Sequence, residues 1–402
     1  MLCRVCGSVL DKEIVKLENM PLTDAFLANT GDNINQHNEF IKDICIHECP
    51  NCFFVQNPAN FNFGEYYLDY NYSSGHSIFV QNFMRNYAEL TIDLVKNNLS
   101  KNQDISVLEV GSGDGVQLKE FKSLGATVVG VEPSDFLAKQ AESNGVPTHQ
   151  ALYDDKIFDH IMPESIDAII SSFTFDHMPD PVEYLKISHN LLRTGGILSF
   201  EVHDLNKIIS RGEFCLFEHE HTIYLTPEDA KNLVEGLGFE CISINPMPEN
   251  AVRANSLIVY ARKVSNNLDS SLQITNKHQD KEFLNIQSKI ESLCENLDNW
   301  IFTKANEKKV IGYGVGGRGV MTIANLKNAH CIAAMMDQNY ESNLLLTPKT
   351  HIPIISSADI KDNKNAFYLI FSFGYFDEIK ETLIRSGVKE EDIFSLKAFY
   401  DG

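Results

Sequence analysis

The sequence predicts an α/β protein in which strands and helices alternate to build parallel sheets. Apolar runs of strand length recur between helix-like segments from about residue 76 to residue 265. Two such runs end in glycine clusters, at Gly111–Gly115 and at Gly312–Gly319. Because 402 residues exceed the size of one ordinary domain, we expect about two or three domains.

The composition is that of a globular protein with sizeable cores, since 43% of the residues are hydrophobic and 22% are charged. The formal net charge of −21 argues against nucleic acid and membrane surfaces as partners, because binding to either requires clustered cations. No apolar run has the length of a membrane span, and the first residues lack a signal-peptide pattern. A cytoplasmic location is therefore expected, while the oligomeric state stays open.

The first predicted domain, residues 1–75, is marked by cysteines, with five of the nine in the chain. Four of them form two Cys-x-x-Cys pairs, Cys3 with Cys6 and Cys49 with Cys52. Four thiolates on two tight turns supply a closed tetrahedral shell, which predicts a structural Zn²⁺ site. The alternative is four reduced cysteines packed as small apolar groups. Zinc is favoured because this segment has little core of its own.

The second predicted domain, residues 76–265, contains a series of strand-like runs. They are Ser106–Val110, Thr127–Glu132, Ala168–Ser172, Gly196–Val202, Glu240–Asn245 and Ser256–Arg262. Most of these runs alternate with helix-like segments, which predicts a parallel sheet of βαβ units. The last two are separated by a proline-containing loop and suit an antiparallel pair that closes the sheet.

The first glycine turn predicts a site for a nucleoside with a cationic centre. An apolar strand breaks into alternating glycines at Gly111 and Gly113, which lets a ligand come close to the backbone. Glu132, at the end of the next strand, can accept hydrogen bonds from a ribose diol. Glu109 and Asp114 place negative charge where a phosphate would be repelled. S-adenosylmethionine fits this description better than a dinucleotide does.

Further contacts to this donor are expected at the tips of later elements. Asp154 or Asp155 could meet the adenine amine, and Asp154 is taken as the candidate although spacing does not choose between them. Ser172 and Phe173, at the next strand tip, are expected to help form the pocket. Each of these residues could instead belong to an ordinary turn, and this alternative is strongest for the two aspartates.

The third predicted domain, residues 283–402, begins with a helical run at Phe283–Lys304. Strand-like runs follow at Lys309–Ile311, Cys331–Met336 and Ala366–Phe371. Its glycine turn, Gly312–Gly319, looks like a dinucleotide fingerprint, but Arg318 suits an anion cradle equally well.

The order of the motifs along the chain carries a resemblance to a known family. The two Cys-x-x-Cys pairs are followed by Asn71–Ser74, Glu109–Gly115, His219-Glu220-His221-x-x-Tyr224, Gly312–Gly319 and Thr350–Ile354. In this order the chain resembles the nucleotide-sugar C-methyltransferases, which add a branch methyl group to deoxysugars. The resemblance covers nearly the whole chain. It implies a class I Rossmann-like methyltransferase domain between a small zinc-binding domain and a C-terminal Rossmann-like domain.

The resemblance also implies an acceptor, a 4-keto deoxysugar linked to a nucleotide such as dTDP, bound between the middle and C-terminal domains. The residues that it implies at the sugar are Tyr72, His177, Glu220, His221 and Tyr224. The C-terminal domain would hold the nucleotide diphosphate, and the candidate contacts there are Gly314, Gly316 and Arg318. This chain has Glu218 where the family usually has tyrosine, which changes the charge at the sugar and makes Glu218 a further candidate.

Methylation of carbon requires a base and a stabilised enolate. His221 is the expected base because imidazole titrates near neutral pH, and Glu220 would orient a neighbour or hold the sugar. His177 and Tyr72 would hydrogen-bond the keto oxygen. The alternative for each histidine is a packed or surface role. Two other functions stay open: an O- or N-methyltransferase on a related molecule, and an NAD-dependent or non-catalytic binder of nucleotide sugars.

Overall fold

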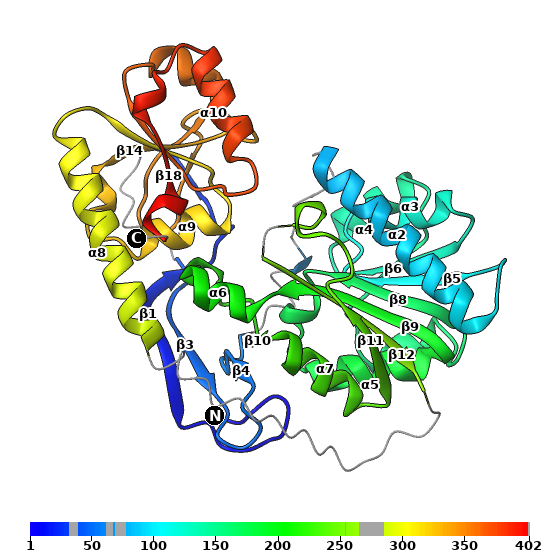
Figure 1. The fold of residues 1–402 in the computed structure, drawn as a ribbon. Helices are drawn as coiled ribbons and strands as arrows, with labels where there is room; N and C mark the ends of the chain where they lie inside the picture. The colour runs from blue at the N-terminus through cyan, green and yellow to red at the C-terminus, as the bar shows by residue number, and fades with distance from the viewer. Residues whose placement is uncertain (32–38, 62–66, 69–77, 254, 265–284, 401–402) are drawn as a thin grey trace. The chain divides into compact units, whose positions relative to one another are not determined.

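The computed structural model describes residues 1–31, 39–61, 67–68, 78–253, 255–264 and 285–400 (Figure 1). Contacts divide the chain into two compact units, each made of segments that are distant in sequence. Unit 1 comprises Met1–Lys12, Glu48–Leu205 and Glu220–His278, and unit 2 comprises Glu13–His47, Asn206–His219 and Gln279–Gly402. The division into domains at 1–75, 76–265 and 283–402 stays a prediction.

A seven-stranded sheet forms the centre of unit 1, in the order β11-β12-β9-β8-β5-β6-β7. Its strands are β5 (Ser106–Val110), β6 (Thr127–Glu132), β7 (Thr148–Gln150), β8 (Ile166–Ser172), β9 (Leu192–His203), β11 (Phe239–Ile244) and β12 (Ser256–Lys263). Strand β12 is antiparallel to both β9 and β11, and the other pairs are parallel. The predicted parallel sheet with an antiparallel closing pair is therefore confirmed.

Helices cover both faces of this sheet, as Figure 1 shows. One face packs on α2 (Ile78–Leu99), α3 (Val116–Ser123) and α4 (Asp135–Ser143), and the other on α5 (Pro181–Leu191) and α7 (Pro227–Glu235). Alternate residues of β5 serve the two cores, since Val107 packs on one face while Leu108 and Val110 pack on the other. The chain turns from β5 to β6 on one side and returns to β8 on the other. In open α/β sheets, ligands bind beyond the carboxyl ends of the strands at such a reversal, which here is the end of β5.

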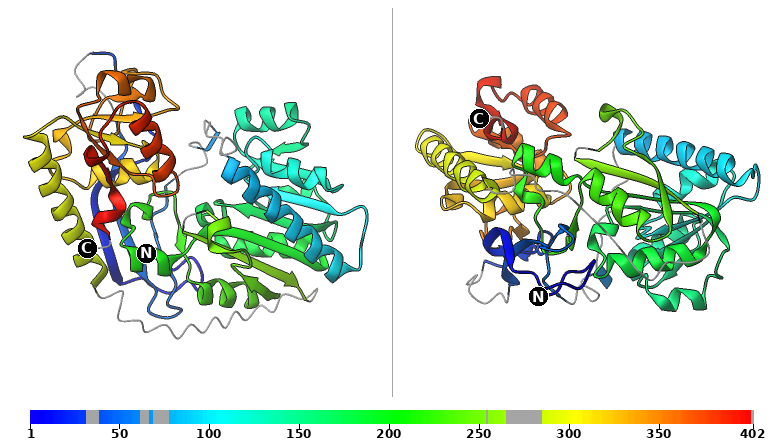
Figure 2. Two further views of the ribbon diagram at one scale, coloured as in Figure 1. Left: turned by 45° about the horizontal axis from the view of Figure 1, so that its top comes forward. Right: turned by 60° about the horizontal axis from the view of Figure 1, so that its bottom comes forward.

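A five-stranded parallel sheet forms the centre of unit 2, in the order β16-β14-β13-β17-β18. Its strands are β13 (Val310–Tyr313), β14 (Ile332–Asp337), β16 (Ile354–Ser356), β17 (Phe367–Ile370) and β18 (Ile393–Ser395). Helices α8 (Ile286–Ala305) and α9 (Gly317–Ala324) pack on one face and α10 (Phe376–Arg385) on the other (Figure 2). The prediction of a second Rossmann-like sheet is confirmed. The start of the predicted helix at Phe283 lies outside the described residues.

The N-terminal segment contributes short strands to both units. In unit 1, β4 (Val55–Gln56) pairs antiparallel with β10 (Ile223–Tyr224). In unit 2, β2 (Leu27–Ala28) pairs antiparallel with β15 (Leu345–Leu346). The longer strands β1 (Lys12–Pro21) and β3 (Ile41–Glu48) are neighbours, and almost all of their residues belong to unit 2. Among the described residues, no helix is long and apolar enough to cross a membrane.

Candidate functional site

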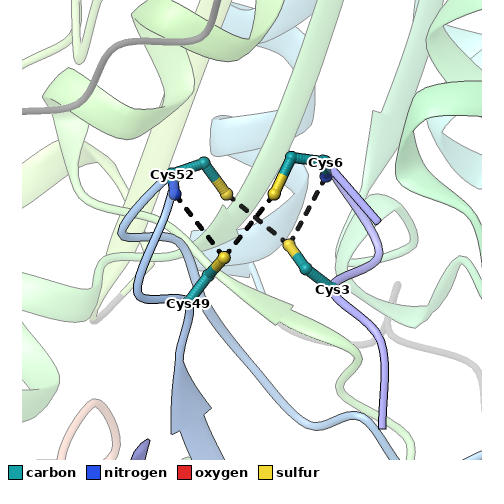
Figure 3. A group of neighbouring side chains, drawn as sticks. All are labelled: Cys3, Cys6, Cys49 and Cys52. Carbon is teal, nitrogen blue, oxygen red and sulfur yellow. Dashed lines mark hydrogen bonds between the residues drawn. The ribbon is translucent and has the colours of Figure 1, made fainter. Parts of the chain in front are cut away.

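Four cysteine sulfurs gather in unit 1 and point toward one another (Figure 3). The sulfurs of Cys3 and Cys52 lie 3.5 Å apart, and those of Cys6 and Cys49 lie 3.6 Å apart. Zn–S bonds of about 2.3 Å separate the sulfurs of a tetrahedral shell by about 3.8 Å. Backbone N–H groups of Cys6 and Cys52 donate to the first sulfur of each pair, which is how short Cys-x-x-Cys turns hold their thiolates. The predicted ligand set therefore fits structural Zn²⁺.

The protonation of these thiols agrees with a cation site. The hydrogen bond from Cys52 lowers the pKa of Cys3 to about 4, so Cys3 is a thiolate near neutral pH. The same contact raises the pKa of Cys52, which therefore keeps its proton until a metal displaces it. Zn²⁺ held by the four sulfurs would displace the remaining thiol protons.

The first glycine turn lies at the carboxyl end of β5. Gly111 has φ +68°, and a Cβ placed on it would come within 2.5 Å of the Thr174 hydroxyl oxygen, so only glycine fits there. Gly113 also has a positive φ, but a Cβ on it would meet nothing within 4 Å. The backbone beside Gly113 is therefore open to a ligand, whereas Gly111 is required by the packing of Thr174.

Glu132 ties this turn to the end of β6. Its carboxylate accepts one hydrogen bond from the Gly113 N–H and one from the Ser134 N–H, each of 2.9 Å. The side chain is buried, and burial raises its pKa. Each carboxylate oxygen keeps a further lone pair, so the predicted bonds to a ribose diol remain chemically possible and stay a prediction.

Two charged residues beside the turn were missed by the sequence analysis. Glu201, fully buried at the end of β9, lies 3.3 Å from a terminal guanidinium nitrogen of Arg253. That guanidinium also lies over the rings of Phe83 and Phe173, 4.7 and 5.0 Å from their centroids. Glu201 is the penultimate residue of the predicted strand Gly196–Val202. An acidic residue near the end of a predicted parallel strand was the signal that could have indicated a site residue. No comparable signal marks Arg253.

Glu109 is a buried carboxyl near the end of β5, just before the turn. It is 3% exposed, and burial raises its pKa well above the ordinary value, with Asp114 and Glu132 adding repulsion. Its Oε2 atom has no hydrogen-bond partner among the described residues. A positively charged ligand would favour the ionised form of this carboxyl, which is the electrostatic reason to expect a sulfonium donor here.

The remaining donor candidates have visible structural roles. Asp154 caps a short helix at Asp155–Asp159, accepting a 3.0 Å hydrogen bond from the Lys156 N–H. Phe173 has φ +49° and packs its ring on His203 at a centroid distance of 4.7 Å. Ser172 is the last residue of β8 and is half-buried beside it. Their contacts to a donor stay predictions.

The predicted acceptor histidines come together at the carboxyl edge of the unit 1 sheet. The rings of His177 and His221 pack edge to face with centroids 4.8 Å apart. Nδ1 of His177 lies 2.7 Å from the Tyr67 hydroxyl, a contact that the sequence analysis missed. Burial and the neighbouring His221 lower the pKa of His177 well below its ordinary value, so its ring is neutral at pH 7. Tyr72 lies outside the described residues.

The segment that carries His221 is held by the residue that follows it. The Thr222 N–H and hydroxyl both donate to the backbone carbonyl of Asp176, at 2.7 and 3.0 Å. The same hydroxyl lies 2.6 Å from the Met178 carbonyl. These bonds fix His221, which is 4% exposed, against the short helix Phe175–His177. Tyr224, in β10, is buried with its ring centroid 6.1 Å from that of His221.

Three side chains of this cluster, Asp176, His203 and His221, offer ligand atoms that all lie within 4.8 Å of one another. Asp176 and His203 were not predicted as site residues. Glu220 precedes His221 in the sequence and is buried, and its role at the sugar stays a prediction. Glu218 belongs to unit 2, where its Oε1 atom lies 2.6 Å from the position of a Cβ on Gly317.

The second glycine turn follows β13 in unit 2. Gly314 has φ +105°, and its N–H donates to the Met336 carbonyl. A Cβ on Gly319 would lie 2.2 Å from the Gly314 carbonyl oxygen, whereas a Cβ on Gly316 would meet nothing within 4 Å. The turn is therefore tight at Gly319 and open at Gly316, directly before the first residue of α9.

Arg318, the predicted diphosphate contact, already has partners within unit 2. Its guanidinium lies 3.5 Å from a carboxylate oxygen of the fully buried Glu213. It also stacks over Phe373 at 4.0 Å and lies 3.5 Å from the Cys215 sulfur. A structural role in balancing Glu213 explains this cation by itself, so its contact to a diphosphate stays a prediction.

Comparison with known proteins places three families along the chain. A zinc binding domain matches residues 3–67, a methyltransferase domain matches 81–244, and a C-methyltransferase C-terminal domain matches 259–389. C-methyltransferase NovU of Streptomyces niveus is 23% identical over 392 residues, which cover 94% of this chain and 90% of NovU.

Two other similarities each cover less than half of the chain. A ubiquinone biosynthesis O-methyltransferase of Colwellia psychrerythraea is 24% identical over 170 residues, 38% of this chain and 68% of that protein. A crystal structure of an S-adenosylmethionine dependent methyltransferase from Mesorhizobium loti is 18% identical, covers 44% of this chain and 99% of its own, and has a TM-score of 0.36.

The strand order of unit 1 and the matched methyltransferase domain define the chain as an S-adenosylmethionine-dependent methyltransferase. The three matched domains, in this order and with the likeness to NovU over nearly the whole chain, make the protein similar to C-methyltransferases with an N-terminal zinc-binding domain. The resemblance found in the sequence is confirmed, as are the two predicted cofactors.

Proposed function

We propose that the protein methylates the carbon next to the keto group of a 4-keto deoxysugar nucleotide, dTDP-linked, in branched-sugar biosynthesis. The observation that carries this proposal is the paired His177 and His221 at the carboxyl edge of the donor sheet. One ring is neutral and tied to a tyrosine hydroxyl, and the other is buried and held in place by Thr222. Such a pair offers one base and one hydrogen-bond donor to a ketone.

In the proposed reaction, His221 takes the hydrogen on the carbon beside the ketone as a proton. The electron pair of that C–H bond becomes the enolate, whose oxygen accepts a hydrogen bond from His177. When the Tyr67 hydroxyl donates to Nδ1 of His177, the ring proton lies on Nε2 and can serve this purpose. S-adenosylmethionine supplies the electrophilic methyl group, and its sulfur keeps the electron pair of the broken bond. His221 then returns its proton to solvent.

The nucleotide part of the substrate is proposed for the glycine turn of unit 2. Gly314 and Gly316 give that turn an open backbone, and helix α9 begins directly after Gly316. Arg318 is the nearby cation proposed to contact the diphosphate while it keeps its ion pair with Glu213. Glu218 beside Gly317 is proposed to influence which sugar is accepted, since a carboxylate there favours hydroxyl or amino donors on the ligand.

The test uses labelled donor and a panel of 4-keto deoxysugar nucleotides, with the product carbon located by NMR. We expect a methyl carbon bonded to the ring carbon beside the keto group. We also expect His221→Asn to abolish deuterium exchange of the ring hydrogen when S-adenosylhomocysteine occupies the donor site. A labelled methyl on oxygen or nitrogen, with the ring hydrogen retained, would contradict carbon methylation.

O- or N-methylation of a related molecule is the second candidate. The observation in its favour is the likeness of 38% of the chain to a ubiquinone biosynthesis O-methyltransferase. Against it stands the C-methyltransferase C-terminal domain that matches residues 259–389. The position of the label in the product separates the two candidates directly.

A further inference from the structure

Asp176 is a buried carboxylate that the proposed reaction has not used so far. It lies in the short helix Phe175–His177 and is 2% exposed. Neither of its carboxylate oxygens has a hydrogen bond of ordinary geometry among the described residues. A buried carboxylate without such bonds costs several kcal/mol unless charge partners surround it. Burial accordingly raises its pKa, while His221 and the backbone N–H groups of Asp176 and His203 act in the opposite direction.

The groups around this carboxylate are imidazoles. Nε2 of His177 lies 4.0 Å from Oδ1 of Asp176, and ring nitrogens of His203 and His221 lie within 4.8 Å of its carboxylate. His221 is also the neighbour whose charge most favours ionisation of Asp176, while Glu201 disfavours it. The titratable groups that face the pair are therefore His177, His203, Glu201 and Tyr224.

The backbone holds this carboxylate and His221 in one rigid arrangement. The Asp176 carbonyl accepts two hydrogen bonds from Thr222, the residue directly after His221. The carbonyl of Asp176 therefore holds Thr222, and its carboxylate lies near the ring of the preceding residue, His221.

We propose that Asp176 is a positioning residue whose carboxylate orients His221 and compensates the imidazolium that forms when His221 takes the acceptor proton. The inference rests on the proposed function. The C–H bond breaks, its electron pair stays on the substrate as the enolate, and an N–H bond forms on His221. Asp176 stays ionised throughout and takes no proton.

A divalent metal is the competing occupant of the cluster formed by Asp176, His203 and His221. In a first-row metal shell, with bonds of about 2.1 Å, neighbouring ligand atoms lie about 3.0 to 3.4 Å apart. The ligand atoms of this cluster all lie within 4.8 Å of one another, a bound that the four cysteine sulfurs also meet. A metal on His221 would remove the lone pair that the base needs. The proposed reaction therefore requires a carboxylate–histidine pair, and a bound metal is a separate outcome of the test.

The first experiment compares Asp176→Asn with Asp176→Glu and with Asp229→Asn, which removes a buried carboxylate from the capping box of α7. With S-adenosylhomocysteine bound, Asp176→Asn should slow deuterium exchange of the ring hydrogen and kcat by about 100-fold. The KM for the donor should change less than about twofold. Asp176→Glu should restore part of the rate, and Asp229→Asn should leave it unchanged.

A second measurement does not depend on the substrate. Long-range ¹H–¹⁵N NMR of the histidine rings should show a single His221 tautomer in the natural protein and a mixture in Asp176→Asn. An unchanged tautomer and an unchanged exchange rate in folded Asp176→Asn would overturn the inference. A second metal ion per chain that disappears with Asp176→Asn would overturn it too. Absence of ring-hydrogen exchange in the natural protein would instead contradict the proposed function. The NMR result would still show whether Asp176 orients His221.

Discussion

The two glycine turns of this protein have the same local construction and different surroundings. In unit 1, the Gly113 N–H donates to Glu132 at the end of the neighbouring strand β6, at 2.9 Å. In unit 2, the Val315 N–H donates to Asp337 at the end of the neighbouring strand β14, at 3.1 Å. Each turn connects a central strand to a helix at the point where strand order reverses.

The charges around the two turns differ. The turn of unit 1 lies among the buried carboxyls Glu109, Glu132 and Glu201, and Arg253 pairs with Glu201 and acts on Glu109. The turn of unit 2 carries Arg318 on its own helix. A strand–glycine–helix motif therefore creates an open backbone, and the surrounding charges select the ligand. This comparison can be tested at each turn separately.

The largest effect is expected from Gly319→Ala in unit 2. Its Cβ would lie 2.2 Å from the Gly314 carbonyl oxygen, which is backbone and cannot move aside cheaply. We expect a loss of unfolding free energy of about 3 kcal/mol or more, measured by denaturant unfolding. Gly316→Ala is the matched control, because its φ is −71° and its Cβ meets nothing within 4 Å. Equal stabilities of the two variants would show that the turn is not tightly packed.

The second effect concerns Arg318. If its main role is to neutralise the charge of the buried Glu213, Arg318→Met should lower the unfolding free energy by about 3 kcal/mol. Adding Glu213→Gln should then recover much of that loss. If Arg318 contacts the diphosphate, the double variant should regain stability and still bind dTDP more weakly in calorimetry. Full stability of Arg318→Met alone would contradict the structural role of this pair.

Much of the fold was predictable because its determinants are local. The strands beside both glycine turns and the closing pair β11–β12 follow from apolar runs and turn residues. Strands of three residues, such as β16 and β18, are too short to show a pattern. The pairing of β4 with β10 joins residues far apart in the chain, and no sequence pattern indicates it.

The candidate site was predictable where one segment supplies both signal and function. Glu132 and the glycines were found in this way. Asp176, Glu201 and Arg253 were missed because their importance comes from burial among residues of other elements. Asp176 directly precedes His177, so the sequence placed it beside the site but could not show that its carboxylate is buried against His221 and His203.

The third effect compares Glu132→Gln with Asp337→Asn. Glu132→Gln replaces a carboxylate that accepts two backbone N–H bonds, and an amide provides only one acceptor oxygen. We expect a loss of roughly 2 kcal/mol in S-adenosylhomocysteine affinity, about 30-fold in Kd. Asp337→Asn should leave this affinity unchanged and affect only nucleotide binding. Calorimetry with both ligands checks this, and a loss of S-adenosylhomocysteine affinity in Asp337→Asn would contradict separate roles for the turns.

The smallest effect is a pH dependence of donor binding. Burial raises the pKa of Glu109, of Glu132 and of Glu201 in the free protein, so each carboxyl keeps its proton to a higher pH than an exposed carboxyl does. A sulfonium cation favours the ionised forms, so binding should release protons and become tighter as pH rises toward and through these raised pKa values. S-adenosylhomocysteine lacks the sulfonium charge and should show a weaker dependence, and dTDP none of this kind. Calorimetry in buffers of different ionisation enthalpy measures the proton count. Proton uptake on S-adenosylmethionine binding would show that these carboxyls do not set the charge preference of the donor turn.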